Sequence, residues 1–182
     1  MLASDPVVIL AVRLAMAGVF VSGGLHQWRD RDMFAAVVEG YALLPRALVA
    51  PVALLLPLAE MTTGLLLLWP ATGPIGALTG LCLLCGVTLA VVINLLRGRR
   101  DIDCGCGGAS DDQTLSWALV GRNAVLAGLL GIATLSSSSR GLAAMDIGVA
   151  VIAGLAALGL YAACNQLMAN APRLRALRNG LA

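Results

Sequence analysis

Long apolar runs separated by short polar segments dominate the chain. The runs of membrane-spanning length cover residues 7–25, 47–69, 75–96, 115–135 and 142–168. A bilayer core of about 30 Å needs roughly 20 apolar residues in a helix, so each run predicts one transmembrane helix. The pattern predicts an all-α, polytopic membrane helical bundle, with residues 1–182 forming a single integral membrane domain.

The segment 28–44, between the first two runs, has a different pattern. Charged residues alternate there with apolar ones, and the apolar ones recur at steps of three and four: Met33, Phe34, Val37, Val38 and Tyr41. This spacing places them on one face of a helix. We therefore expect a short amphipathic helix lying at the membrane interface.

Composition supports a membrane protein and excludes other classes. Hydrophobic residues make up 59% of the chain and charged residues 12%, and the mean hydropathy is +0.90. Soluble domains have about a quarter charged residues, so a soluble enzyme, a secreted domain and a disordered chain are all excluded. The net charge of +2 gives no basic patch for nucleic acid, and the expected surroundings are the lipid bilayer.

The arginines are distributed unequally between the two sides of the predicted bundle. Arg140 lies on one side, and the other side carries Arg29, Arg31, Arg46, Arg97, Arg99, Arg100, Arg173, Arg175 and Arg178. By the positive-inside rule, the second side, which includes the loop 97–114, faces the cytoplasm.

The loop 97–114 carries the most specific motif of the chain, Cys104-Gly105-Cys106. Two thiols separated by one flexible glycine can close a small disulfide ring. Such a bridge is strained, which makes it easier to reduce and more oxidising. These cysteines are the predicted catalytic pair of a thiol–disulfide oxidoreductase, and metal ligation or an incidental pair are the alternatives.

Charged neighbours are expected to support this loop. Arg97 and Arg99 favour the reactive thiolate, whereas Asp101 and Asp103 oppose it, so the sign of their combined effect on the thiol pKa stays open. Structural zinc usually has four ligands, and the single histidine of the chain cannot complete a conventional set. No metal is therefore assigned.

A second pair, Cys82 and Cys85, lies inside the third apolar run. On a helix the two side chains share a face about one turn apart. Packing as small hydrophobes is the ordinary interpretation. The alternative is a dithiol that relays electrons through the bilayer.

Ionisable groups inside apolar runs form a predicted intramembrane polar core, which consists of Arg13, Glu60, Arg122 and Asn123, with His26 at the end of the first run. Charges within the bilayer are costly and need partners, so an ion pair of Glu60 with Arg13 or Arg122 is one expectation. The other is a polar pocket below the cysteine loop that binds a quinone or moves protons, with His26 as proton carrier or hydrogen-bond partner. No cofactor is certain, and a quinone is the candidate.

Several segments together resemble one family, the methylamine utilisation protein MauE family. They are Arg97-Gly98-Arg99, Asp101-Ile102-Asp103-Cys104-Gly105-Cys106, Tyr41-Ala42-Leu43-Leu44-Pro45, Leu56-Pro57-Leu58-Ala59-Glu60 with Gly64, and Arg122-Asn123. The resemblance implies a DoxX-like four-helix core plus a fifth C-terminal transmembrane helix. Two departures are Gly107, where an aromatic residue is common, and His26-Gln27, where a lysine is common.

The resemblance also implies a function, which is maturation of the disulfide-rich small (β) subunit of methylamine dehydrogenase. It implies a thioredoxin-like periplasmic partner, MauD, and a bacterial inner (cell) membrane location. Thiol partners in the periplasm favour a periplasmic cysteine loop, against the arginine count. Alternatives are a non-catalytic scaffold or chaperone for the subunit and its partner, or a small-solute transporter built on the polar core.

Overall fold

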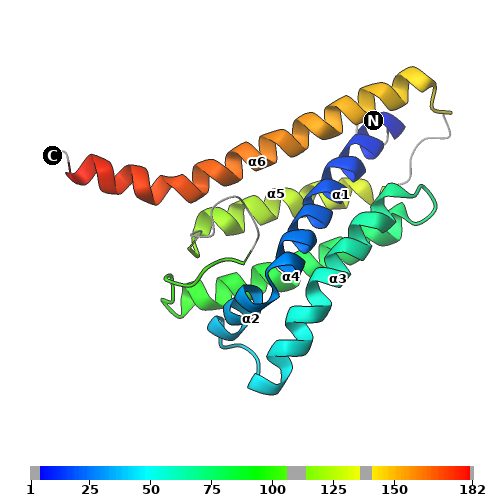
Figure 1. Cartoon of the computed structure of the whole chain (residues 1–182). Coiled ribbons are helices and arrows are strands. Elements are labelled where there is room, and N and C mark those ends of the chain that lie inside the picture. The colour runs from blue at the N-terminus through cyan, green and yellow to red at the C-terminus, as the bar shows by residue number, and fades with distance from the viewer. Residues whose placement is uncertain (1–4, 106–113, 136–140, 181–182) are drawn as a thin grey trace.

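The computed structural model describes residues 5–105, 114–135 and 141–180, with side chains up to residue 171. Helices make up most of the described chain (Figure 1). Its elements are α1 (Pro6–Arg29), α2 (Arg31–Gly40), α3 (Arg46–Leu68), α4 (Gly73–Leu96), α5 (Trp117–Ala133) and α6 (Ala144–Gly180).

The long apolar runs form the expected helices. Four helices are long and apolar enough to cross a membrane, namely α1, α3, α4 and residues Ala144–Ala171 of α6. The 17-residue α5 is shorter, but it is equally apolar in character and lies at the lower end of the spanning range. The prediction of an all-α, polytopic helical membrane protein is confirmed.

The amphipathic segment forms a shorter helix than the pattern 28–44 suggests. The α1 helix continues to Arg29, and Asp30 then caps α2, its Oδ1 accepting a hydrogen bond from the Met33 amide at 3.2 Å. The helix ends at Gly40, and the next residues lead to Pro45, which precedes α3. Phe34 and Val37 of α2 are buried, as the three- and four-residue spacing predicts.

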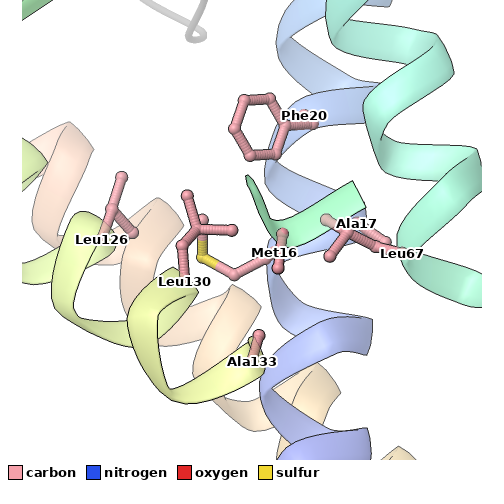
Figure 2. Close-up of a cluster of buried hydrophobic side chains, with 8 residues drawn as sticks. Met16, Ala17, Phe20, Leu67, Leu126, Leu130 and Ala133 are labelled. Carbon is pink, nitrogen blue, oxygen red and sulfur yellow. The ribbon is translucent and has the colours of Figure 1, made fainter. Parts of the chain in front are cut away.

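The α1 helix is the central element, since it contacts α3, α5 and α6. Figure 2 shows Met16 and Phe20 of α1 together with Leu67 of α3 and Leu126 and Leu130 of α5. These side chains are nearly or fully buried and belong to one apolar cluster. The cluster joins three helices that are far apart in the sequence.

Glycines let α1 and α3 approach each other closely. A Cβ added at Gly24 would lie 2.7 Å from the backbone oxygen of Pro57, and one added at Gly64 would lie 2.6 Å from a methyl of Val21. Small residues at helix contacts are the usual device for close packing in membranes, where no hydrophobic effect drives helices together. This crossing fixes the position of the last turn of α1 relative to the middle of α3.

We predict that Gly24→Ala destabilises the bundle. The added methyl meets backbone, which cannot rotate away, and overpacking of this kind costs about 1–3 kcal/mol. The control is Gly121→Ala on α5, where nothing lies within 4 Å of the added Cβ. There the better helix propensity of alanine, worth about 1 kcal/mol, should leave stability unchanged or raised. Thermal unfolding in detergent, followed by circular dichroism, distinguishes the two variants, and equal midpoints would contradict the close crossing.

Candidate functional site

The first part of the cysteine loop folds back against the end of the bundle. Asp103 forms an isolated antiparallel bridge with Thr114, and the Leu115 amide donates to the backbone oxygen of Ile102 at 3.1 Å. Cys104 is only 6% exposed and packs in a second apolar cluster with Val37 and other side chains. The cysteine predicted in a polar surface loop is therefore buried.

The four cysteines that the structure describes differ in state. Cys104 is disulfide-bonded, and Cys82, Cys85 and Cys164 have free thiols. Cys106 lies outside the described residues, so the predicted Cys104–Cys106 redox pair stays a prediction.

A buried tyrosine holds the backbone of Cys104. The Tyr41 hydroxyl, at the end of α2, donates to the Cys104 backbone oxygen at 3.2 Å. Arg99 in turn donates through Nη1 to the Tyr41 backbone oxygen at 3.3 Å and to Asn94 Oδ1 at 3.5 Å. Arg99 therefore contacts Tyr41 and not a cysteine directly, and its role in supporting a redox loop stays a prediction.

Gly105 closes the loop onto α2. Its φ of +64° is in the left-handed region, and an added Cβ would lie 2.8 Å from a methyl of Val37. Both features require glycine. The backbone oxygen of Gly105 accepts a hydrogen bond from Gln27 Nε2 at 3.3 Å, which ties the loop to α1.

Gln27 also contacts the carboxylate inside the membrane. Its Nε2 donates to Glu60 Oε1 of α3 at 3.5 Å, and Gln27 itself is 6% exposed. The Gln27 side chain therefore joins Glu60 to the cysteine loop. The other amide atom, Oε1, is buried and has no hydrogen-bond partner among the described residues.

The predicted ion pair with Arg13 is not what the structure shows. Arg13 donates through Nε and Nη2 to the backbone oxygen of Ala133, at 3.2 and 3.0 Å. Ala133 is the last residue of α5, and a carbonyl at a helix end lacks an intrahelical partner, which explains the contact. Arg13 precedes Gln27 by fourteen residues, or about 21 Å along the helix, and so belongs to the opposite end of the bundle.

Arg122 and Asn123 do lie near the site, in a network of amides and hydroxyls. Arg122 donates to Asn165 Oδ1 of α6 at 2.6 Å and to Asn123 Oδ1 at 3.0 and 3.2 Å. Asn123 Nδ2 donates to Thr88 Oγ1 of α4 at 2.9 Å. This network connects α4, α5 and α6 and supplies acceptors to the Arg122 guanidinium, and the expected ion pair of Arg122 with Glu60 is not seen among the described residues.

A cavity of about 400 Å³ lies between the cysteine loop and these polar groups. Most of its lining is apolar, and Met16, Phe20 and Leu126 of Figure 2 form part of it. Its polar lining residues include Gln27, Tyr41, Glu60, Cys82, Cys104, Arg122 and Asn123. The predicted polar pocket below the cysteine loop is therefore present as a largely apolar cavity with a few polar groups, the usual form of a small-molecule site.

Other predicted residues lie outside this cavity. His26 is exposed and does not line it, and Arg97 and Asp101 are exposed at the loop. Cys82 lines the cavity whereas Cys85 does not, and both are exposed on α4 instead of packed in the protein. Their relay role stays a prediction. Within the described residues, no group of three or more histidine, cysteine or acidic side chains is placed to hold a metal.

The sequence alone predicts no role in the site for Gln27 or Asn165, and it places Tyr41 only on the apolar face of the segment 28–44. Tyr41 is 63 residues from Cys104, and Gln27 is 78 residues from Gly105. Local pattern carries no information on contacts this distant. The one available signal was polarity at the ends of apolar runs, where a side chain that remains near lipid needs a partner.

The fold and the site define a class: a polytopic helical membrane protein in which a disulfide-bonded cysteine lines a largely apolar cavity that also contains a partly buried carboxylate. The profile of the family described as methylamine utilisation protein MauE matches residues 5–136. The chain belongs to this family.

Relatives named "Methylamine utilization protein MauE" support the assignment. The protein from Paracoccus versutus is 35% identical over 90% of this chain and 88% of its own length. The protein from Methylorubrum extorquens is 37% identical over 89% of this chain and 88% of its own length. The protein from Paracoccus denitrificans is 35% identical over 86% of this chain and 85% of its own length. No solved structure matches the chain significantly.

We predict that Gly105→Ala loosens the cysteine loop more than Gly98→Ala does. Both glycines have positive φ, +64° and +76°, so an alanine is strained at each. Nothing lies within 4 Å of a Cβ at Gly98, whereas one at Gly105 meets Val37. The rate at which a water-soluble thiol reduces the Cys104 disulfide should therefore rise more for Gly105→Ala. Equal rates for the two variants would show that the contact with α2 does not hold the loop.

Tyr41 gives the loop a predictable response to alkaline pH. Burial raises the pKa of Tyr41 from 10.0 to about 12, and the positive charge of Arg122 offsets part of this rise. The pKa of Tyr41 is higher in the folded than in the unfolded protein. Its protonated hydroxyl therefore contributes its full share to the free energy of unfolding below pH 10, and this contribution is lost as the pH rises through about 12. A tyrosinate absorbance titration should show a late step that Tyr41→Phe removes. A single step near pH 10 in the parent protein would mean that the hydroxyl is solvated.

Proposed function

We propose that the protein is a membrane thiol–disulfide redox protein required for maturation of the methylamine dehydrogenase small (β) subunit, with Cys104 and Cys106 as the redox pair. The observation that supports this most directly is the disulfide-bonded Cys104, held by Tyr41 above a cavity inside the bundle. Family membership supports the connection to methylamine utilisation.

The proposed reaction is disulfide exchange with a dithiol protein. A partner thiolate attacks one sulfur of the loop disulfide, the other sulfur leaves as a thiolate, and a mixed disulfide forms. The second partner thiol then resolves it, so that the partner becomes oxidised and the loop becomes a dithiol, with two electrons transferred. Because Cys104 is 6% exposed, we assign the attacked position to Cys106 and the leaving thiolate to Cys104.

We infer that the direct partner is the thioredoxin-like periplasmic protein MauD, the β subunit, or both. The cysteine loop is then periplasmic, in a bacterial inner membrane, because disulfides persist in the periplasm and are rare in the cytosol. Arg97, Arg99, Asp101, Asp103 and Gly105 support the loop in this proposal. Arg99 and Gly105 do so through the contacts with Tyr41 and Gln27.

We predict that replacing Cys104 and Cys106 by serine abolishes the disulfide-bonded β subunit in cells that make methylamine dehydrogenase. Cys164→Ser, which removes an exposed free thiol of α6, should leave the subunit intact. The readout is the amount and the redox state of the β subunit, measured by thiol labelling and immunoblotting. If the double variant still matures the subunit while the membrane level of the protein is unchanged, the scaffold alternative replaces the redox one.

The side of the membrane is measured in the same strains. A membrane-impermeant reductant followed by an impermeant maleimide should label the parent protein in intact cells and not the Cys104 and Cys106 double variant. Labelling that requires opened cells would place the loop in the cytoplasm and would contradict direct exchange with periplasmic partners.

A further inference from the structure

We propose that the cavity beneath the cysteine loop binds a membrane quinone, which accepts electrons from the reduced loop. The inference rests on the proposed function, because it requires the Cys104 disulfide to be redox-active. It adds the chemical class of the electron acceptor and the site where the acceptor binds.

The position of the cavity favours a lipid-soluble ligand. Its volume of about 400 Å³ falls in the range of small-molecule sites, and its walls come from the membrane-spanning helices. Cys82 and Gly86 of α4 line the cavity and are also exposed on the surface of that helix. The cavity is therefore accessible from the side of the bundle, where lipid is the solvent. Cys104 and Gly105 line its loop end, so a ring bound there lies beside the disulfide.

A buried hydrogen-bond acceptor indicates what kind of group the ligand carries. Gln27 Nε2 donates to two acceptors, Glu60 Oε1 and the Gly105 backbone oxygen, and this fixes the orientation of the amide. The Gln27 Oε1 atom remains, buried and without a donor among the described residues. An unsatisfied buried acceptor is unfavourable, so a ligand that donates an O–H group to Gln27 Oε1 gains a hydrogen bond. A quinol hydroxyl is such a donor, whereas an acyl chain is not.

The reaction balances with a quinone as the only oxidant. The two thiols of the reduced loop lose two electrons and two protons, two S–H bonds break and one S–S bond forms. The quinone gains both electrons and both protons and becomes a quinol, with a new O–H bond at each ring oxygen. The Glu60 carboxyl group lines the cavity and contacts Gln27 at 3.5 Å, and in this proposal it takes up one proton released by the thiols and passes it to a ring oxygen. Disulfides formed in a substrate protein require electrons to leave the loop, which sets this direction.

Gly86 provides a direct test, because nothing lies within 4 Å of a Cβ added there. Gly86→Phe therefore places a ring in the cavity without meeting a neighbouring backbone. The control is Gly128→Phe on α5, where nothing lies within 4 Å either and which does not line the cavity. A second variant, Gln27→Leu, keeps roughly the side-chain volume and removes the acceptor together with the Nε2 hydrogen bonds to Glu60 and Gly105.

The full-length protein, purified in detergent and reduced with a thiol that is then removed, is mixed with decylubiquinone. Loss of the quinone ultraviolet band and loss of free Cys104 thiol are followed together. We expect about one quinone reduced per loop in the parent protein and in Gly128→Phe. Gly86→Phe should slow the reaction roughly tenfold or more. Gln27→Leu should raise the concentration of added decylubiquinol that half-inhibits the reaction by roughly tenfold, because Gln27 Oε1 accepts a hydrogen bond from the quinol and not from the quinone.

Exchange with reduced thioredoxin, measured without quinone, distinguishes this inference from the proposed function. If the loop exchanges with thioredoxin but leaves decylubiquinone oxidised, the quinone site is wrong and the exchange function stands. If the loop reacts with neither, both fail. If Gly86→Phe does not fold, unchanged inhibition by decylubiquinol in Gln27→Leu overturns the site. A quinone reaction that Gly86→Phe and Gly128→Phe slow equally places the reaction outside the cavity.

Discussion

Gln27 donates one amide group to two acceptors, the Glu60 carboxylate of α3 and the Gly105 backbone oxygen of the cysteine loop. A partly buried carboxylate and a partly buried loop carbonyl both gain from a donor, because a polar group removed from water is unfavourable without a hydrogen bond. Gln27 reaches both only because Gly24, one turn earlier, brings α1 against the backbone of Pro57. The close crossing of α1 and α3 is thus a condition for the loop to sit where it does, and for a cavity to remain beneath it.

The same end of the bundle is held by backbone-directed contacts more than by ion pairs. Tyr41 donates to the Cys104 oxygen, and Arg99 donates to the Tyr41 oxygen. Cys104 is therefore fixed at its backbone, while its disulfide remains beside the cavity. The proposed redox role requires this division, because the sulfurs must react while the loop keeps its position.

Much of the fold follows from the sequence because the bilayer fixes the length of a spanning helix, so that long apolar runs have one structural solution. The site follows only in part. Cys104, Glu60 and Arg122 stand out as unusual residues in their surroundings, and all three line the cavity. Their partners Gln27 and Tyr41 do not stand out in the sequence, because they are ordinary residues that tertiary contacts bring near. The expected Arg13–Glu60 pair fails for the same reason: charge complementarity was visible in the sequence, whereas the free carbonyl of Ala133 depends on where α5 ends.

The arginines near the cysteine loop bear on which side of the membrane it faces. Their number favours the cytoplasm by the positive-inside rule. Two of them make contacts at this end of the bundle: Arg99 donates to the Tyr41 backbone oxygen, and Arg31 stacks on Trp28 at 3.6 Å. The pair of Arg46 with Glu39 at 3.5 Å is exposed and contributes little. An arginine that the fold requires is present for that reason, whichever side it occupies, so its weight as a topological signal falls. The contacts therefore reduce the conflict between the arginine count and the periplasmic loop of the proposed function.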